Sequence, residues 1–393
     1  MRIAYDFRRI MNAGIGRYMR GIAKAIAELS PNDQMLLILP RDGEWHLDIP
    51  ANAEAIYAKA KYYSVAEQWE LPKILRSWHA DVLHAPHFVV PFMKVCPTAV
   101  TVHDVIHLVY PHDISSKFGR YYADFMLRQA VSRSDAVITV TEFSKSEIVR
   151  CLGTSAAKID VAPLGADAAL RRVSEEARIR AIREEFNLQG NFILYTGIFR
   201  DRKNHQGLFR AFEIVARAIP DCDLVIAGSL GGGAAVIEGE ARRAGIEDRI
   251  RLTGFIPDEK LAALYSSATV YACPSLYEGF GFTILEAAAC GTPVVAHRGS
   301  SLTEVGGDGV EFADARNPEE FAAALLRVIT RPEVSARLIE KGYENLERFS
   351  WRRCGELTYA VYERIAGTQL SAERQVDVGE ERYKRPVGGE TRI

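Results

Sequence analysis

Residues 278–286 of the chain read Glu278-Gly-Phe-Gly-Phe-Thr-Ile-Leu-Glu286. An apolar run, 268–273, precedes this stretch, and an alanine-rich segment, 286–290, continues it. The order of apolar run, glycine loop and alanine-rich segment predicts a strand, a loop and a helix. Similar alternations recur along the whole chain, which indicates an α/β protein with parallel sheets and crossover helices.

The loop has the features of a site for a polyol or an anion. Gly279 and Gly281 let a ligand approach the backbone closely, and the N–H groups from Phe282 onward are unpaired at the predicted helix start. Glu286, about one turn into the helix, can accept hydrogen bonds from the vicinal hydroxyls of a ribose, and Glu278 faces the same crevice from the strand side. Alternatively, Glu278 caps the helix and Glu286 is a solvated helix residue.

The composition indicates two compact domains, because 393 residues exceed what one hydrophobic core usually serves. A balance of 49 Lys and Arg against 51 Asp and Glu argues against a dedicated nucleic-acid binder. Six cysteines without a Cys-x-x-Cys pair fit reduced thiols in a cytoplasmic protein. We expect neither an N-terminal secretion signal nor a membrane span, since no apolar run approaches ~20 residues.

The alternation of strands and helices falls into two halves. We predict a first domain at 1–168, a charged and partly helical linker at 169–190, a second domain at 191–350 and a disordered tail at 367–393. Two doubly wound domains place their ligand sites at the carboxyl ends of the strands, so the predicted site is a cleft between them. Strands are expected at 2–5, 35–39, 55–58, 82–84, 99–103, 136–140 and 159–162, and then at 192–196, 223–227, 250–252, 270–272 and 293–296.

A cationic loop follows the first predicted strand of the second domain. The chain leaves this strand through Gly197 and then presents Arg200, Arg202 and Lys203 before a helix. Arg202 can donate two parallel hydrogen bonds, and Lys203 carries a compact charge, so the pair suits a diphosphate without a metal. We expect Lys203 to be exposed. A solvated basic turn is the alternative interpretation.

A glycine loop near the N-terminus is the counterpart of this loop in the first domain. Gly14 and Gly16 open a predicted helix, and backbone amides there can approach a pyrophosphate. The third glycine of the dinucleotide fingerprint is missing, so the motif alone is a weak signal. Two such loops on opposing domains would close around one nucleotide-sugar.

Histidines are concentrated between residues 79 and 112. His84, His87, His103 and His107 could suggest zinc, but no cysteine completes a tetrahedral set and no histidine pair shares a helix with a glutamate base. Because His103 and Asp104 end an apolar strand that points to the cleft, His103 is interpreted as a substrate contact. The alternative is a strand-end histidine satisfied within the protein.

Several of these motifs, taken together, resemble those of the retaining GT-B glycosyltransferases of family 4, over about residues 1–366. The motifs occur in the same order: Gly14-Ile-Gly16-Arg17, His103-Asp104, Arg202-Lys203-Asn204, Leu252-Thr-Gly254-Phe255 and Glu278-x7-Glu286. The resemblance implies two Rossmann-like domains that face an interdomain cleft, with a final helix at 351–366 that crosses back to the first domain. The first loop departs from the family pattern, since Asn12-Ala13 replaces a longer glycine run.

The resemblance also implies roles for individual residues. Arg202 and Lys203 would neutralise the departing diphosphate, and His103 would lie beside the transferred sugar. These three residues and Glu278 form the predicted catalytic set. Glu286 would bind the ribose of the donor. The acceptor would contact His84, His87 and Asp104. The predicted donor-binding set comprises Gly14, Gly16, Gly197, Arg202, Lys203, Gly254, Phe255, Ile256, Glu278, Gly279, Phe280, Gly281, Phe282, Thr283 and Glu286.

The implied activity is transfer of a hexose from a nucleotide-sugar, with retention of configuration and without a metal or other cofactor. The histidine motifs look most like bacterial O-antigen and exopolysaccharide mannosyltransferases, which favours GDP-mannose as donor and a glycan or lipid-linked acceptor. The first domain would then touch the inner membrane face through 89–94 and 110–120. A UDP-sugar donor, a non-catalytic nucleotide-sugar-binding protein and a sugar-nucleotide epimerase are the alternatives.

Overall fold

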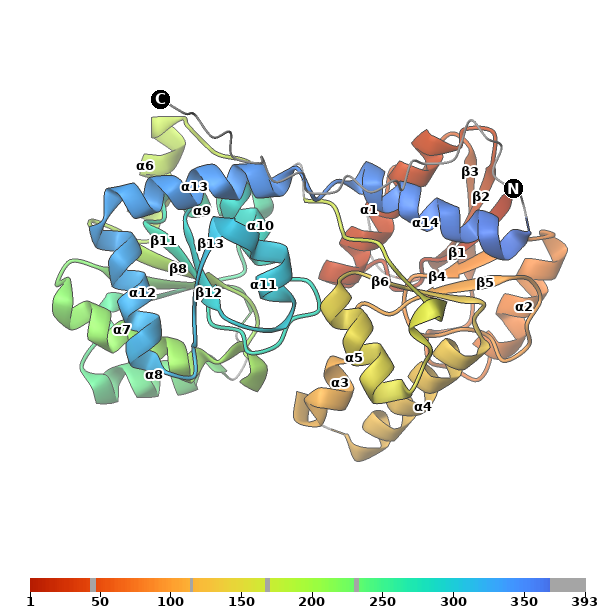
Figure 1. Cartoon of the computed structure of the whole chain (residues 1–393), viewed down its shortest axis with the longest axis horizontal. Coiled ribbons are helices and arrows are strands. Elements are labelled where there is room, and N and C mark those ends of the chain that lie inside the picture. The colour runs from red at the N-terminus through yellow and green to blue at the C-terminus, as the bar shows by residue number, and fades with distance from the viewer. Residues whose placement is uncertain (43–46, 114–115, 167–169, 230–232, 368–393) are drawn as a thin grey trace, which may run out of the picture.

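The computed structural model of the chain describes residues 1–42, 47–113, 116–166, 170–229 and 233–367. Two lobes lie side by side, each with a sheet at its centre and helices outside it (Figure 1). The predicted tail, except for Gly367, lies outside the described residues. No helix in the described part of the chain is both long and apolar enough to span a bilayer.

The first lobe contains a parallel seven-stranded sheet in the order β3-β2-β1-β4-β5-β6-β7. The strand order reverses direction next to β1, which is the switch point where doubly wound sheets bind ligands. Every strand predicted in this half is present. Their bounds are β1 Arg2–Asp6, β2 Gln34–Pro40, β3 Ala53–Ala58, β4 Val82–Ala85, β5 Thr98–Thr101, β6 Ala136–Thr139 and β7 Ile159–Val161.

The second lobe contains a parallel six-stranded sheet in the order β10-β9-β8-β11-β12-β13. The predicted strands are again present, but β13 was not predicted. It is a four-residue edge strand with a glutamate inside it, too short for a periodic signal. The bounds are β8 Phe192–Thr196, β9 Asp223–Ala227, β10 Ile250–Gly254, β11 Val270–Cys273, β12 Val294–His297 and β13 Val310–Ala313.

Helices cover both faces of each sheet, as crossover connections between parallel strands require. Helix α6 lies inside the predicted linker and packs on α9 of the second lobe. In the first lobe the helices are α1 Ala13–Leu29, α2 Glu67–Ser77, α3 Ile106–Val109, α4 Lys117–Arg133 and α5 Glu142–Leu152; after it come α6 Glu176–Glu185, α7 His205–Ala218, α8 Gly233–Ala244, α9 Asp258–Ser267, α10 Phe282–Ala289, α11 Ser300–Gly306, α12 Pro318–Thr330, α13 Pro332–Leu346 and α14 Trp351–Ala366.

The final helix, α14, leaves the second lobe and lies beside α1 of the first (Figure 1). Trp351 at its start fills the space that side chains would occupy at Gly21 and Gly165, where an added Cβ would lie 2.3 and 2.4 Å from its atoms. Further along, the Tyr359 hydroxyl donates to Asp33 at 2.5 Å. The C-terminal segment therefore closes the core of the first lobe, although it follows the second in sequence.

Candidate donor site between the two domains

The glycine loop lies between β11 and α10, as the sequence predicts. Gly281 is the N-cap of α10 and has φ +100°, a conformation that favours glycine. At Gly279 an added Cβ would lie 2.8 Å from Cβ of Asp104 in the first domain. The Gly279 carbonyl accepts hydrogen bonds from the hydroxyls of Thr141 and Ser144, both at 3.0 Å. The loop is thus held directly against the first domain.

The two cations of the basic loop lie beside Glu278 in the three-dimensional structure. Arg202 and Lys203 belong to a short 3-10 helix after β8. Lys203 Nζ is 2.5 Å from Glu278 Oε1, and an Arg202 guanidinium nitrogen is 3.4 Å from Oε2. The expectation that Lys203 is exposed is wrong, because its side chain is only 13% exposed and is held in this ion pair.

Glu278 remains charged in this setting. Burial acts to raise the pKa of its carboxyl, but the charges of Lys203 and Arg202 outweigh burial and hold the pKa below its ordinary value. Arg202 also pairs with Asp113 of the first domain at 3.0 Å. The cluster is therefore balanced, with two cations against two carboxylates, and a bound diphosphate has to compete with those carboxylates for the cations.

Glu286 lies in the first turns of α10 and is 8% exposed. Its Oε1 accepts from Arg17 of α1, and its Oε2 accepts from the Tyr265 hydroxyl at 3.0 Å. The alternative of a solvated helix residue is therefore excluded. Since Arg17 belongs to the first domain, a ribose that bound Glu286 would have to share or replace this interdomain contact.

The glycine loop of the first domain reaches the same region through Arg17. Gly14 faces open space, whereas an added Cβ at Gly16 would lie 2.0 Å from the carbonyl oxygen of Ile10. Gly16 is therefore explained by backbone packing alone. The Arg17 guanidinium also lies over the Phe282 ring, 5.2 Å from its centre.

His103 lies at the carboxyl end of β5, packed edge-on against Tyr18 at 4.8 Å. Burial lowers the pKa of its imidazole to about 4, so the ring is neutral near pH 7. Its Nε2 lies 3.0 Å from the Pro86 carbonyl, which can only accept, so the proton is on Nε2 and Nδ1 is an acceptor. The Asp104 carboxylate accepts a hydrogen bond from the backbone amide of Ile106, two residues further along the chain. Burial raises the pKa of this carboxyl.

The two other histidines predicted to bind the acceptor occupy different settings. His84 is fully buried, with its ring nitrogens 2.8 Å from the Thr101 hydroxyl and 2.6 Å from the Tyr362 hydroxyl. It joins β4 to α14 and offers an acceptor no surface in this structure. His87 is half-buried and lies 3.2 Å from the Tyr63 hydroxyl, at the wall of a cavity.

The remaining predicted donor residues differ in their accessibility. Phe255 is 81% exposed after β10, while Ile256 is 7% exposed and belongs to the core. Phe280 is also a core residue and packs against Phe349. Thr283 and Phe282 are half-buried, and Gly197 directly follows β8.

The structure adds Arg17, Tyr265 and Asp113 to the site. Arg17 belongs to the glycine motif of the first domain, so the sequence already draws attention to it. The sequence does not show that it pairs with Glu286. Asp113 and Tyr265 have no motif around them. They are recognisable only because the fold brings them against Arg202 and Glu286.

The fold and the site define a class of protein: two doubly wound domains joined by a crossing C-terminal helix, with cations and carboxylates of both domains at their interface. A family model described as Glycosyl transferases group 1 matches residues 178–345, and one described as Glycosyltransferase Family 4 matches residues 13–170. The chain belongs to the family 4 glycosyltransferases and has the GT-B fold.

Individual proteins support this assignment. The chain is 29% identical to the O-antigen chain mannosyltransferase B of Escherichia coli over 289 residues, 73% of this chain and 75% of that protein. It is 30% identical to a D-inositol 3-phosphate glycosyltransferase of Segniliparus rotundus over 256 residues, 63% of this chain and 56% of that protein. HepE of Anabaena, solved with UDP and glucose, superimposes with a TM-score of 0.72 at 19% identity, over 93% of this chain and 100% of that one.

The buried histidine makes stability depend on pH. Burial lowers the pKa of His84 to about 3, so the unfolded chain binds a proton that the folded chain does not as the pH falls below the ordinary value near 6.5. The stabilisation linked to neutral His84 is therefore fully present above pH 6.5 and is lost as the pH falls below it. Between pH 7.5 and pH 5, His84 should account for about 2 kcal/mol of lost unfolding free energy.

Urea unfolding at both pH values measures this effect. The His84→Gln variant should start less stable than the parent but lose about 2 kcal/mol less between the two pH values. Equal losses in parent and variant would assign the acid sensitivity to other groups.

Proposed function

We propose that the chain transfers a hexose, with mannose from GDP-mannose favoured, to a glycan or lipid-linked acceptor with retention of configuration, in the synthesis of cell-surface polysaccharide. The observation that carries the proposal is the convergence of Arg202 and Lys203 on Glu278 beside the glycine loop. Glu286 lies at the same interface, with a carboxylate suited to ribose hydroxyls.

Charge stabilisation would be the main source of catalysis. As the glycosidic bond breaks, negative charge develops on the leaving nucleoside diphosphate, and Arg202 and Lys203 stand where they can neutralise it. The acceptor hydroxyl would attack from the same face as the leaving group, assisted by the diphosphate oxygens. This route retains configuration without a protein nucleophile.

His103 would orient the transferred sugar. Its neutral ring presents Nδ1 as an acceptor, which suits a hydrogen bond from a sugar hydroxyl. A protonated ring would lose this acceptor and would add a positive charge close to the transferred sugar. The low pKa of His103 keeps the ring in the required form across the neutral range.

The similarities to known proteins point to two different donors. The mannosyltransferase of Escherichia coli favours a mannosyl donor, whereas HepE was solved with UDP and glucose. A thermal-shift series with GDP, UDP, GDP-mannose and UDP-glucose, followed by product analysis with and without an added glycan, separates them. We expect the largest shift with GDP and GDP-mannose; a larger shift with the UDP pair would assign the donor to uridine nucleotides.

Activity should survive an excess of EDTA. The cationic loop already supplies positive charge to the diphosphate, which in other transferases comes from a bound divalent ion. Transfer rates measured before and after EDTA treatment, with dialysed protein as control, test this. A loss of activity that Mg²⁺ or Mn²⁺ restores would show that the cations of the loop do not suffice.

Peripheral contact with a membrane is part of the proposal, through the first domain. In the segment 89–94, Phe92 and Met93 are 38% and 45% exposed, and Lys94 is exposed beside them. Exposed aromatic and basic side chains together suit an anionic interface. Phe92 also contacts Phe125 of α4, with ring centres 6.3 Å apart.

A further inference from the structure

A cavity of about 540 Å³ lies in the first domain next to His87. Its walls are mainly aromatic, and no aspartate, glutamate, asparagine or glutamine lines it among the described residues. The lining residues come from the loops after β1, β3 and β4, from α3 and from the start of α4: Arg9, Tyr63, His87, Phe88, His107, Phe118, Gly119, Tyr122 and Ala123.

Arg9 is the cation of this cavity. Its guanidinium lies over the rings of Tyr62 and Tyr63, at 5.3 and 5.6 Å, and in the part of the chain that the structure describes no carboxylate pairs with it. Its Nε is buried without a hydrogen-bond partner among those residues. The nearby carboxylates are used by the preceding arginine, Arg8, which pairs with Asp6 and Glu67.

The two histidines of the cavity add polarity without balancing this charge. His107 Nε2 is buried and makes no hydrogen bond to any residue the structure describes. Burial holds the pKa of His87 well below its ordinary value, and the charges of His103, Arg9 and His107 lower it further. The cavity thus combines an apolar wall with a cation that pairs with no carboxylate among the described residues, and an anionic group of a ligand could take that place.

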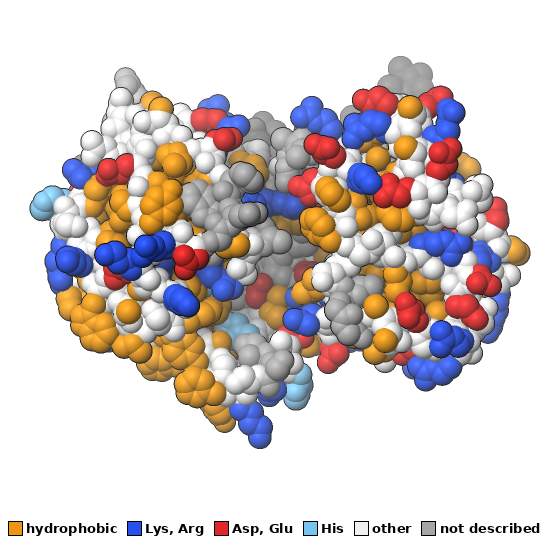
Figure 2. Space-filling model, turned by 180° about the vertical axis from the view of Figure 1, so that it is seen from behind, with side chains coloured by type: hydrophobic (Ala, Val, Ile, Leu, Met, Phe, Trp, Pro, Cys, Tyr) orange, Lys and Arg blue, Asp and Glu red, His pale blue; other side chains and the backbone are white. Residues whose placement is uncertain are grey.

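The cavity borders an apolar stripe on α4, because Phe118 and Tyr122 belong to both. Phe118, Tyr121, Tyr122 and Phe125 are spaced three and four residues apart, so they share one face of the helix. Phe118 and Tyr121 are each 78% exposed, and Phe125 is 52% exposed. Hydrophobic side chains gather along the lower edge of this lobe in Figure 2, and Phe92 contacts Phe125 with ring centres 6.3 Å apart.

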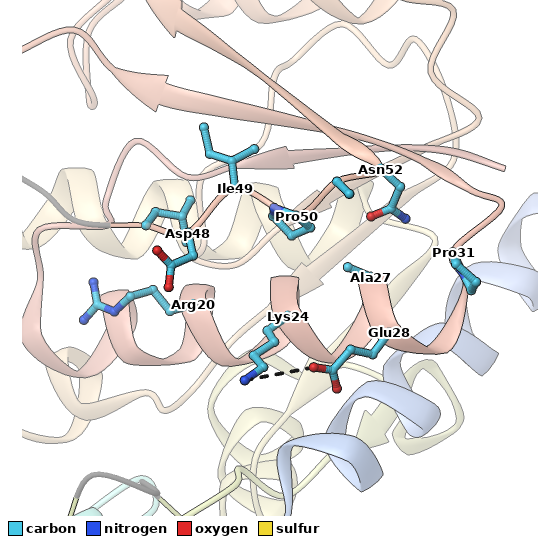
Figure 3. A pocket seen from close by; sticks show the side chains of 11 residues that line it. Arg20, Lys24, Ala27, Glu28, Pro31, Asp48, Ile49, Pro50 and Asn52 are labelled. Atoms are coloured by element: carbon cyan, nitrogen blue, oxygen red, sulfur yellow. Dashed lines mark ion pairs between the residues drawn. The ribbon is translucent and has the colours of Figure 1, made fainter.

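A second cavity of the first domain has a different lining from the cavity beside His87. It measures about 500 Å³ and lies between α1 and residues 47–52 (Figure 3). Charges of both signs line it, including Lys24 and Glu28 at 4.0 Å from each other, and its walls contain no aromatic residue among those described. Nothing there selects one class of ligand, whereas the cavity beside His87 does.

We infer that the cavity lined by Arg9, His87 and Phe118 binds a phosphate ester of a hydrocarbon alcohol, with the phosphate at Arg9 and the chain against the aromatic walls. A bare sugar fits less well, because it carries no negative charge to pair with the Arg9 guanidinium. The inference rests on the proposed function, in which this compound is the carrier of the acceptor. Asp104, which contacts Gly279 of the donor loop, lies three residues from His107 and connects the cavity to the donor site.

Titration calorimetry on the full chain, without donor, tests the inference with octyl phosphate below its micelle concentration. Binding should saturate and be at least about tenfold tighter than for octyl glucoside or inorganic phosphate, because only octyl phosphate uses both the cation and the apolar wall. Arg9→Gln should lower the affinity about tenfold. Arg128→Gln, which changes an exposed arginine of α4 outside this cavity, should leave it within about twofold.

A matched pair of aromatic variants locates the ligand. Phe118 and Tyr121 are equally exposed on one helix, so substitution of either residue should leave folding unaffected. Of the two, only Phe118 lines the cavity. Phe118→Ala should weaken octyl phosphate binding about threefold or more, and Tyr121→Ala should not. Equal effects of the two variants, or octyl glucoside binding as tightly as octyl phosphate, would overturn the inference.

Flotation with anionic vesicles separates a membrane headgroup from a single bound molecule. If the stripe merely adsorbs to membranes, Phe118→Ala and Tyr121→Ala should reduce flotation equally and neither should change calorimetric binding, which contradicts the inference.

Nucleoside diphosphate binding, followed by thermal shift in the same preparations, is independent of the cavity. Octyl phosphate binding without a nucleotide shift would therefore refute the proposed transfer while supporting the cavity, and the opposite result would refute only the cavity.

Discussion

Lys203→Ala should reduce the rate of transfer by a factor of ~10²–10³, the effect of removing one preorganised group that stabilises developing negative charge. The expected cause is loss of the ammonium that faces the leaving diphosphate. Steady-state kinetics with donor and acceptor measure the loss, which should appear in kcat as well as in kcat/KM, because the charge is largest in the transition state.

The structure requires a stability control for this experiment. Removing Lys203 leaves the carboxylate of Glu278, which is 12% exposed, with Arg202 as its remaining cation, so the variant should melt below the parent. The double variant Lys203→Ala with Glu278→Gln also removes the carboxylate charge that has lost one of its two cations, and it should recover most of the melting temperature. Recovery of stability together with near-parental turnover would mean that Lys203 is only a structural partner of Glu278.

Glu286→Gln should weaken nucleoside diphosphate binding by about ten- to a hundredfold, since hydrogen bonds to a charged carboxylate contribute ~1.5–3 kcal/mol each. The physical reason is the loss of the carboxylate that accepts from the ribose hydroxyls. Calorimetry with the ribonucleotide and its 2'-deoxy analogue isolates this contact. The parent should prefer the ribonucleotide, and the variant should bind both about equally.

Arg17→Met provides the matched control for this prediction. It removes the first-domain partner of Glu286 but leaves the carboxylate and its hydrogen bond from Tyr265 in place. The preference for the ribonucleotide should therefore persist. A parent protein that ignores the 2'-hydroxyl would reassign Glu286 to the interdomain contact with Arg17 alone.

The position of the glycine loop illustrates what is predictable at each level. Its strand, loop and helix were evident from local apolar periodicity and from two glycines, because these features depend on residues close in sequence. Gly281 has φ +100° at its place before α10, a conformation that the sequence analysis did not predict. For Gly279 the structure adds a reason that the sequence does not show, since Asp104 of the other domain fills the space where a side chain would stand.

Histidine roles were harder to infer. The strand-end position of His103 predicted a substrate contact, and the family resemblance implied that His84 and His87 contact the acceptor. His84, however, is enclosed by Thr101 and by Tyr362 of the last helix. That enclosure depends on a segment that lies 278 positions away in the sequence. A pattern within 79–112 contains no information about it.

The sequence by itself determined the class of fold, because alternating strands and helices and the glycine motifs are local and repeat along the chain. It also supplied the charged residues from which the site is built. Only the tertiary structure decided their pairing: Lys203 with Glu278, Arg202 with Asp113, and Arg17 with Glu286. The physical reason is that each pair joins distant segments, which meet only when the two sheets form and the domains pack against each other. The same packing places Arg9 in an aromatic cavity without a carboxylate among the described residues, an imbalance of charge that no motif records.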